Sequence, residues 1–318
     1  MAVELNVISE VTASADGHEV NLGPARQRCV LAVLAVEANR LVPADQLADR
    51  VWGEQVPYRA AGTLRSYLSR LRTALATAGG FGIQRRTGGY VLSVDESAVD
   101  LHRFRLLLSR ARDTTDDDHA AALFENAFAL WRGEPFAGLD SPWLDDVRNG
   151  LAAEHLAARL DFHDVQLRRG RHTELAPDLL ALAADHPWHE RLAAQAMLAL
   201  YRSGRQANAP SFYEELRVRL GAELGVDPST PLRELHQRIL TSDPAIAPTG
   251  AATASVPRQL PAVPRAFTGR AAELSELDST DARARVSLLA GSAGSARRGS
   301  HCGGRTTTRT ASPTASCT

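Results

Sequence analysis

A leucine stripe in the stretch GTLRSYLSRLRTAL, residues 62–75, constrains the fold of this chain more than any other feature. Leu64, Leu68, Leu71 and Leu75 recur at steps of four, three and four residues, the spacing that places side chains on one face of a helix. The other face carries glycine, serine, threonine and arginine. We therefore predict an amphipathic helix that buries its leucines and exposes a basic, hydroxyl-rich face.

That exposed face is basic and has no acidic counterpart. Between residues 59 and 90 the charged residues are six arginines, whereas a solvated helix face normally mixes acidic with basic side chains. The whole chain has a formal net charge of -1, so a surface for an anionic partner must be local. Lysine is absent, and the planar guanidinium of arginine suits phosphate and guanine recognition.

The residues around this helix predict a winged helix-turn-helix. The expected elements are strands at 3–8 and 11–14, a hairpin turn at Asp16-Gly17 leading into HEVNL, helices opened by Pro24 and Pro43, a third helix over 59–77, and two strands around Thr87-Gly88-Gly89. In this fold the third helix enters the major groove of DNA and the final hairpin, the wing, reaches the adjacent minor groove.

We therefore predict that the basic face and the wing bind duplex DNA. Small side chains allow a close approach, Ser and Thr bond phosphates or bases, and Arg pairs with guanine. Arg70 is expected to read a base and Arg72 to contact a phosphate. The residues expected to contact DNA are Arg59, Thr63, Arg65, Ser66, Ser69, Arg70, Arg72, Thr73, Arg85 and Arg86.

From residue 99 onward the pattern predicts helices only. The expected helices cover 100–112, 116–133, 141–170, 173–185, 188–203, 206–220 and 231–241. A step of 34 residues relates Gly170-Arg171 to Gly204-Arg205, and also Leu179 to Tyr213 and Leu182 to Leu216. This step is the tetratricopeptide period, a helix-turn-helix unit that stacks and usually binds proteins or peptides. The alternative is a merely structural helical bundle.

No motif predicts an enzyme, a cofactor site or a metal centre. His186, His189 and Glu190 are close in sequence but lack a further convergent ligand, so we expect Pro187 to open a helix with Trp188 packed. No nucleophile motif accompanies His155, His163 and Asp164. Core positions are expected for Cys29, Trp52, Trp131 and Trp143.

The predicted fold class is mainly α with small β, in three segments. A winged helix-turn-helix covers 1–97, an all-α tetratricopeptide-like domain covers 98–243, and a linker with a disordered tail covers 244–318. Three cysteines form no disulfide framework, and we find no membrane span or signal peptide. These features favour a cytoplasmic protein.

Several stretches resemble the Streptomyces antibiotic regulatory protein family. Three stretches resemble the winged helix of that family: LGPARQRCVLAVLAVEANRLVPADQLADRVWG, TLRSYLSRLRTAL and TGGYVL. Six further stretches resemble the bacterial transcriptional activation domain that follows the winged helix in that family: VDLHRF, ALWRGEPFAGL, PWLDDVR, HPWHERL, MLALYRSGRQA and ELGVDPSTPLRELHQRIL. The resemblance covers about residues 3–241, with the motifs in the expected order.

The resemblance implies an activator of antibiotic and other secondary-metabolite genes, acting at the nucleoid. Members bind direct repeats near the promoter as side-by-side dimers and recruit RNA polymerase. Double-stranded DNA, RNA polymerase holoenzyme and a second copy of the chain are therefore the expected partners. Two alternatives stay open from the residues themselves: a tetratricopeptide-like protein-binding scaffold, and a DNA-binding regulator that has lost activation.

The chain departs from the family pattern at two places. Pro210 falls in the helix after the SGRQA motif, where proline costs about 3 kcal/mol outside the first turn, so we expect that helix to start after Asn208. Farther on, PRAFTGRAAEL and VSLLAGSAG resemble the start of the nucleotide-binding ATPase domain of larger members. Ala296, Arg297 and Arg298 replace the P-loop residues there, so we expect a truncated domain without ATPase activity.

Overall fold

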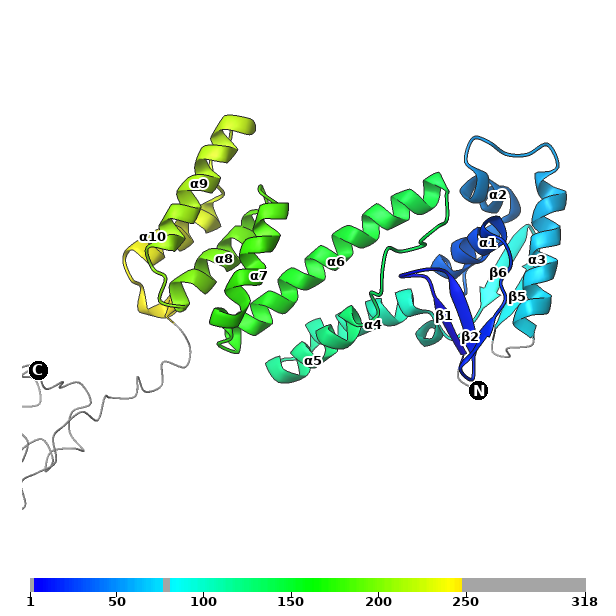
Figure 1. The fold of residues 1–318 in the computed structure, drawn as a ribbon, viewed down its shortest axis with the longest axis horizontal. Coiled ribbons are helices and arrows are strands. Elements are labelled where there is room, and N and C mark those ends of the chain that lie inside the picture. The colour runs from blue at the N-terminus through cyan, green and yellow to red at the C-terminus, as the bar shows by residue number, and fades with distance from the viewer. Residues whose placement is uncertain (1–2, 77–80, 248–318) are drawn as a thin grey trace, which may run out of the picture. The chain divides into compact units, whose positions relative to one another are not determined.

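The chain begins with a small antiparallel sheet that leads into helices and a β-ribbon (Figure 1). The computed structural model describes residues 3–76 and 81–247. The first sheet has the order β1-β2-β3, with strands Val3–Asn6, Thr12–Ala15 and His18–Val20. Asp16 and Gly17 both take positive φ values in the turn between β2 and β3, as the sequence predicts.

The winged helix-turn-helix follows this sheet. Its elements are α1 (Ala25–Val36), β4 (Val42–Pro43), α2 (Ala44–Trp52), α3 (Ala60–Ala76), β5 (Gly82–Arg86) and β6 (Gly89–Ser93). The wing sheet has the order β4-β6-β5, and the short strand β4 was not predicted. Pro24 and Pro43 are N-caps, so each helix starts one residue later than expected.

The remaining elements are helical. They are η1 (Glu96–Ala98), α4 (Asp100–Asp113), α5 (Asp117–Phe128), α6 (Pro142–Arg168), α7 (His172–Asp185), α8 (Glu190–Arg202), α9 (Asn208–Glu223), α10 (Thr230–Leu240) and η2 (Pro244–Ile246). The predicted fold class, mainly α with small β, is confirmed. Within the described ranges, no helix has the length and apolar character needed to cross a membrane.

Two helix ends differ from the sequence prediction, and a third agrees with it. Helix α5 ends at Phe128, and the residues up to Gly133 form turns instead of a continuing helix. Helix α8 begins at Glu190 with His189 as its N-cap, so Pro187 does not open it. Pro210 lies in the first turn of α9, which begins at Asn208 as expected.

Trp188 was predicted to pack, and this prediction is wrong. Its side chain is half exposed, and its indole N–H donates to Glu223 at 3.2 Å. Since Pro187 and Trp188 lie outside helix α8, the indole reaches across to α9. Trp52, Trp131 and Trp143 are half-buried against the main core, as expected.

The 34-residue repeat is built from matching helix ends. Gly170 and Gly204 have φ values of +79° and +78°, which only glycine adopts without strain. In both copies the residue after the glycine closes the helix, since Arg171 N–H donates to Gln166 and Arg205 N–H donates to Leu200. The paired positions carry buried side chains in both copies: Leu167 and Tyr201, Leu179 and Tyr213, Leu182 and Leu216. The residues after 247, including the P-loop-like stretch, lie outside the described part of the chain.

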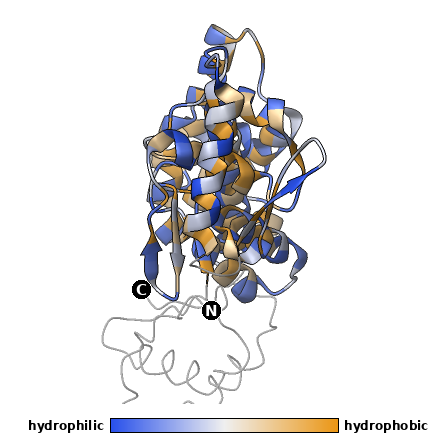
Figure 2. Ribbon diagram, turned by 90° about the vertical axis from the view of Figure 1, so that its right-hand side faces the viewer, coloured by the Kyte–Doolittle hydropathy of each residue, from blue (hydrophilic) through white to orange (hydrophobic). Residues whose placement is uncertain are grey.

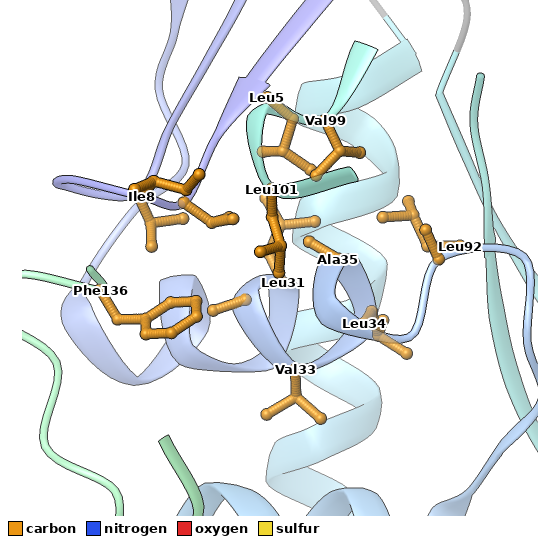
Figure 3. Close-up of a cluster of buried hydrophobic side chains, with 14 of the residues drawn as sticks. Leu5, Ile8, Leu31, Val33, Leu34, Ala35, Leu92, Val99, Leu101 and Phe136 are labelled. Atoms are coloured by element: carbon orange, nitrogen blue, oxygen red, sulfur yellow. The ribbon is translucent and has the colours of Figure 1, made fainter. Parts of the chain in front are cut away.

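One hydrophobic core joins the winged helix to the first helices that follow the wing (Figure 3). Helix α1 is buried on nearly all sides, from Cys29 to Ala35, because both sheets and several helices pack around it. Leu5 and Ile8 meet it from the first sheet, and Phe136 meets it from the loop before α6. Burial raises the pKa of the Cys29 thiol to about 11, which keeps it protonated and unreactive.

Asp100 ties the first sheet to helix α4. Its carboxylate accepts from Val7 N–H at 2.8 Å and Ile8 N–H at 2.9 Å, and Leu101 N–H donates to it at 2.7 Å. Burial raises the pKa of this carboxyl, while the N–H donors of Ile8, Val7 and Leu101 act in the opposite direction. Phe136 N–H donates to Val7 O nearby, so the same loop is held from two sides.

We predict that Asp100→Ala lowers the free energy of unfolding by about 2–4 kcal/mol, because it leaves the buried N–H groups of Val7 and Ile8 without acceptors. Denaturant unfolding measures the loss. The control is Asp95→Ala, which removes an exposed carboxylate that accepts only from Ser97. Equal losses of unfolding free energy in the two variants would contradict the proposed clamp, in which the Asp100 carboxylate holds the backbone of Val7 and Ile8.

Candidate nucleic-acid interface

Helix α3 has one buried face and one solvent-exposed face, as the leucine stripe predicts. Leu64, Leu68, Leu71 and Leu75 are buried against the core that contains α1. Arg59 directly precedes the helix, and its carbonyl accepts from Gly62 and Thr63 in the first turn. In Figure 2 this helix stands in front, with hydrophilic and hydrophobic residues interleaved along its ribbon.

The predicted DNA-contacting residues lie mostly on the open surface. Arg59, Arg65, Ser66, Ser69, Arg70, Thr73, Arg85 and Arg86 are exposed, whereas Thr63 and Arg72 are half-buried. All of them belong to α3, its first flanking residue or strand β5. Helix α3 packs against strand β5 of the wing, so the fold brings these two segments of the sequence together.

Several polar side chains of α3 are folded back onto the helix. The hydroxyls of Ser66 and Thr73 donate to the carbonyls four residues earlier, each at 3.2 Å, and Arg65 Nε–H donates to Ala61 O at 3.1 Å. Their oxygens can still accept, but these donors are already engaged. Arg70 makes no side-chain hydrogen bond to any residue between 3–76 or 81–247, so all the N–H groups of its guanidinium are available to a ligand.

The arginines of this surface lack acidic partners. Within the described ranges, none of Arg59, Arg65, Arg70, Arg72, Arg85 and Arg86 forms an ion pair. In the activation-domain helices, by contrast, Arg105 pairs with Glu154 at 2.8 Å and Arg168 pairs with Asp117 at 2.6 Å. Unpaired arginine concentrates positive potential on α3 and the wing, although the whole chain is nearly neutral.

The wing is a tight hairpin with its arginines near the tip. Strands β5 and β6 pair antiparallel, with Arg85 opposite Tyr90 and Arg86 opposite Gly89. Gly88 has a φ value of +86° in the two-residue turn. Arg86 donates to the side chain of Gln84 at 2.7 Å, while both arginines stay exposed.

The turn end of the wing is held against β4 and the first residue of α2. Strand β4 pairs with β6, and Ala44 N–H donates to Gly88 O at 3.1 Å. A side-chain carbon at Gly89 would lie 2.2 Å from Val42 O, so only glycine allows this approach. Strand β4 has no periodic signal in the sequence, because a strand of two residues shows no alternation.

Arg72 lies beneath the wing instead of on the open face. Its Nε–H donates to Ile83 O at 2.7 Å, and its guanidinium lies 5.8 Å from the centre of the Tyr90 ring. The sequence placed this residue on the flank of the helix and assigned it to a phosphate. In the structure the side chain connects α3 to both strands of the hairpin.

Sequence reasoning did not single out Tyr58. Its side chain is fully exposed, in the loop that leads into α3, beside Arg59. The phenol of this exposed side chain can bond a phosphate. The only signal in the sequence was its place in the Pro57-Tyr58 loop.

The histidine-containing group in the activation domain has structural roles. His189 caps α8 by accepting from Leu192 N–H at 3.4 Å, and Glu190 accepts from Ser229 N–H at 2.9 Å. Over the ranges 3–76 and 81–247, no three His, Cys, Asp or Glu side chains are grouped closely enough to hold a metal ion.

Two family profiles match the chain in tandem. Residues 17–92 match a profile described as transcriptional regulatory protein, C terminal, and residues 99–240 match the bacterial transcriptional activator domain. The regulatory protein DnrI of Streptomyces peucetius is 36% identical over 78% of this chain and 96% of its own length. The chain belongs to the Streptomyces antibiotic regulatory protein family.

Longer members of this family extend well beyond the chain. The regulatory protein AfsR of Streptomyces coelicolor is 42% identical over 87% of this chain, a match that spans 28% of AfsR. A solved structure of Mycobacterium tuberculosis EmbR, in complex with a low affinity phosphopeptide, has a TM-score of 0.70 and 29% identity. That match covers 76% of this chain and 66% of EmbR.

We predict that Gly89→Ala destabilises this family member by about 1–3 kcal/mol, because the added carbon meets the backbone of Val42 and β6 must shift away from β4. Thermal or denaturant unfolding measures the effect. Gly82→Ala is the matched control in the same hairpin, since a side-chain carbon there meets nothing within 4 Å. Equal stability of the two variants would show that the pairing of β4 with β6 adjusts without cost.

Proposed function

We propose that this chain is a sequence-specific DNA-binding transcriptional activator of secondary-metabolite genes. It binds direct repeats near the promoter as a side-by-side homodimer, recruits RNA polymerase holoenzyme, and works in the cytoplasm at the nucleoid. The observation that carries the proposal is the unpaired arginine surface of α3 and the wing. The family membership and the named transcriptional regulators among its relatives support it.

The contacts divide between the two grooves. Helix α3 enters the major groove with Arg59, Thr63, Ser69 and Arg70, while Arg85 and Arg86 at the wing serve the minor groove. Ser66 and Thr73, whose hydroxyl donors are engaged along the helix, contribute acceptors, and Arg65 contributes charge and its two terminal nitrogens, which are free within the described residues, at the edge of the groove. The protein acts by binding, and no cofactor or catalytic residue takes part.

Direct repeats follow from how two copies sit on one face of DNA. A side-by-side arrangement keeps both copies in the same orientation, so their half-sites have the same direction. Centres about one helical turn apart, roughly 10 base pairs, place both recognition helices on the same side of the duplex. The activation domains then lie along one line toward a bound polymerase.

The first test is selection of duplexes from a random DNA pool by the purified full chain at near-physiological salt. Enrichment of two like-oriented half-sites about one helical turn apart is the expected result. Weak, salt-sensitive binding without enrichment would reject the proposal and favour the tetratricopeptide-like scaffold. Enrichment without stimulation of transcription in vitro would instead identify a DNA-binding regulator that has lost activation.

We predict that Arg70→Ala costs about 1–3 kcal/mol of binding to the selected site and relaxes the base preference at one position, because Arg70 is the free donor that can pair with guanine. Competition binding with single-base variants of the site measures both effects.

Arg110→Ala is the matched control for this substitution. It removes the same charge from an exposed helical position on α4, away from α3 and the wing. A uniform loss across all DNA sequences in Arg70→Ala would show that Arg70 contacts phosphate and not a base.

A further inference from the structure

Arg72 occupies a position from which one side chain touches three elements. It projects from α3, bonds the carbonyl of Ile83 in β5, and faces the ring of Tyr90 in β6. Ile83 lies two residues before Arg85, and Tyr90 is the cross-strand partner of Arg85. The guanidinium therefore contacts both strands directly beneath a wing arginine.

The geometry uses only part of the guanidinium. Nε–H is committed to Ile83 O at 2.7 Å, a short hydrogen bond strengthened by the positive charge. The two terminal nitrogens make no hydrogen bond to residues 3–76 or 81–247. A flat guanidinium can thus hold the wing with one edge and present its other edge to DNA.

We propose that Arg72 is a positioning residue that fixes the wing relative to the recognition helix. It thereby sets the separation between the major-groove and minor-groove contacts, a role beyond the phosphate contact expected from the sequence. The effect of Arg72 on DNA contacts rests on the proposed DNA-binding function. The contacts of Arg72 with Ile83 and Tyr90, which we call the brace, are a property of the free protein.

The other ties of the wing run through its turn and β6. Strand β4 pairs with β6 next to the turn, and the Gly88 carbonyl accepts from Ala44 N–H, whereas β5 contacts its hairpin partner β6 and helix α3. Ile83 is buried beneath the strand, while Gln84, Arg85 and Arg86 are exposed. Loss of the bond to Ile83 therefore removes a direct link between α3 and the strand that carries both wing arginines, and leaves that strand held by its pairing with β6.

The substitution Arg72→Lys distinguishes a phosphate contact from a role in positioning the wing. Arg72→Lys retains one positive charge for a phosphate but loses the Nε–H donor and the planar edge that spans Ile83 and Tyr90. A residue that only contacts phosphate would tolerate this change. A brace would not, because a single ammonium cannot hold the carbonyl, face the ring and reach DNA together.

The first experiment is hydrogen exchange of the free full chain, measured by mass spectrometry. We expect amide exchange in β5 and β6 to become about tenfold faster in Arg72→Lys, while exchange in α1 and the buried face of α3 is unchanged. Arg70→Lys is the matched control on the same helix, and it should leave wing exchange as in the wild type. Unchanged wing exchange in Arg72→Lys would overturn the brace whether or not the protein binds DNA.

The second experiment compares base preferences of the variants by competition binding on the selected site. Arg72→Lys is expected to lose preference at the positions flanking each half-site, as Arg85→Ala does, while keeping the central preference and the salt dependence of the wild type. The double variant, which combines Arg72→Lys with Arg85→Ala, should lose no more base preference at the flanking positions than either single variant.

Two results of the second experiment would overturn the positioning role: intact flank preference in Arg72→Lys, or a uniform loss at every position. If the wild-type chain selects no DNA sequence, the proposed function fails. In that case the exchange experiment alone decides whether Arg72 holds the wing.

Discussion

The buried carboxylate of Asp100 and the core around it make the winged helix and the first activation-domain helices one body. The carboxylate holds the loop after β1 by two backbone N–H groups, and Phe136 bonds the same loop from the segment before α6. Ser141, the N-cap of α6, donates to the carbonyl of Arg50 at the end of α2. The proposed DNA-binding surface is therefore oriented by contacts that lie outside its own helices.

The proposed function depends on arginines of α3 and the wing that form no ion pair within the described residues. The activation-domain helices carry arginine too, but Arg105, Arg112 and Arg168 are matched to carboxylates on facing helices. Such exposed pairs add little stability, yet they cancel the charge they carry. On α3 and the wing no such cancellation occurs among the described residues, so a nearly neutral chain acquires a local cationic surface.

Local patterns predicted the parts of the fold that repeat, and missed those that depend on distant partners. The leucine stripe of α3 and the glycines of the 34-residue repeat were readable because their spacing follows helix geometry. Strand β4, the clamp at Asp100 and the bond from Arg72 to Ile83 have no periodic signal, since each joins segments that meet only after folding. Trp188 was misplaced because composition suggested burial, while helix α8 starts two residues later.

Helix α6 has a mechanical consequence of its own. Its first turn is seated in the winged-helix core and its last turns pack in the repeat, and its 27 residues span about 40 Å. A rotation of about 5° at one end moves the other by about 3.5 Å for a lever of this length. A small tilt of the winged helix would thus displace the repeat by about the width of an atom. Helix α6 can in this way turn a change at one end of the fold into a movement of the other.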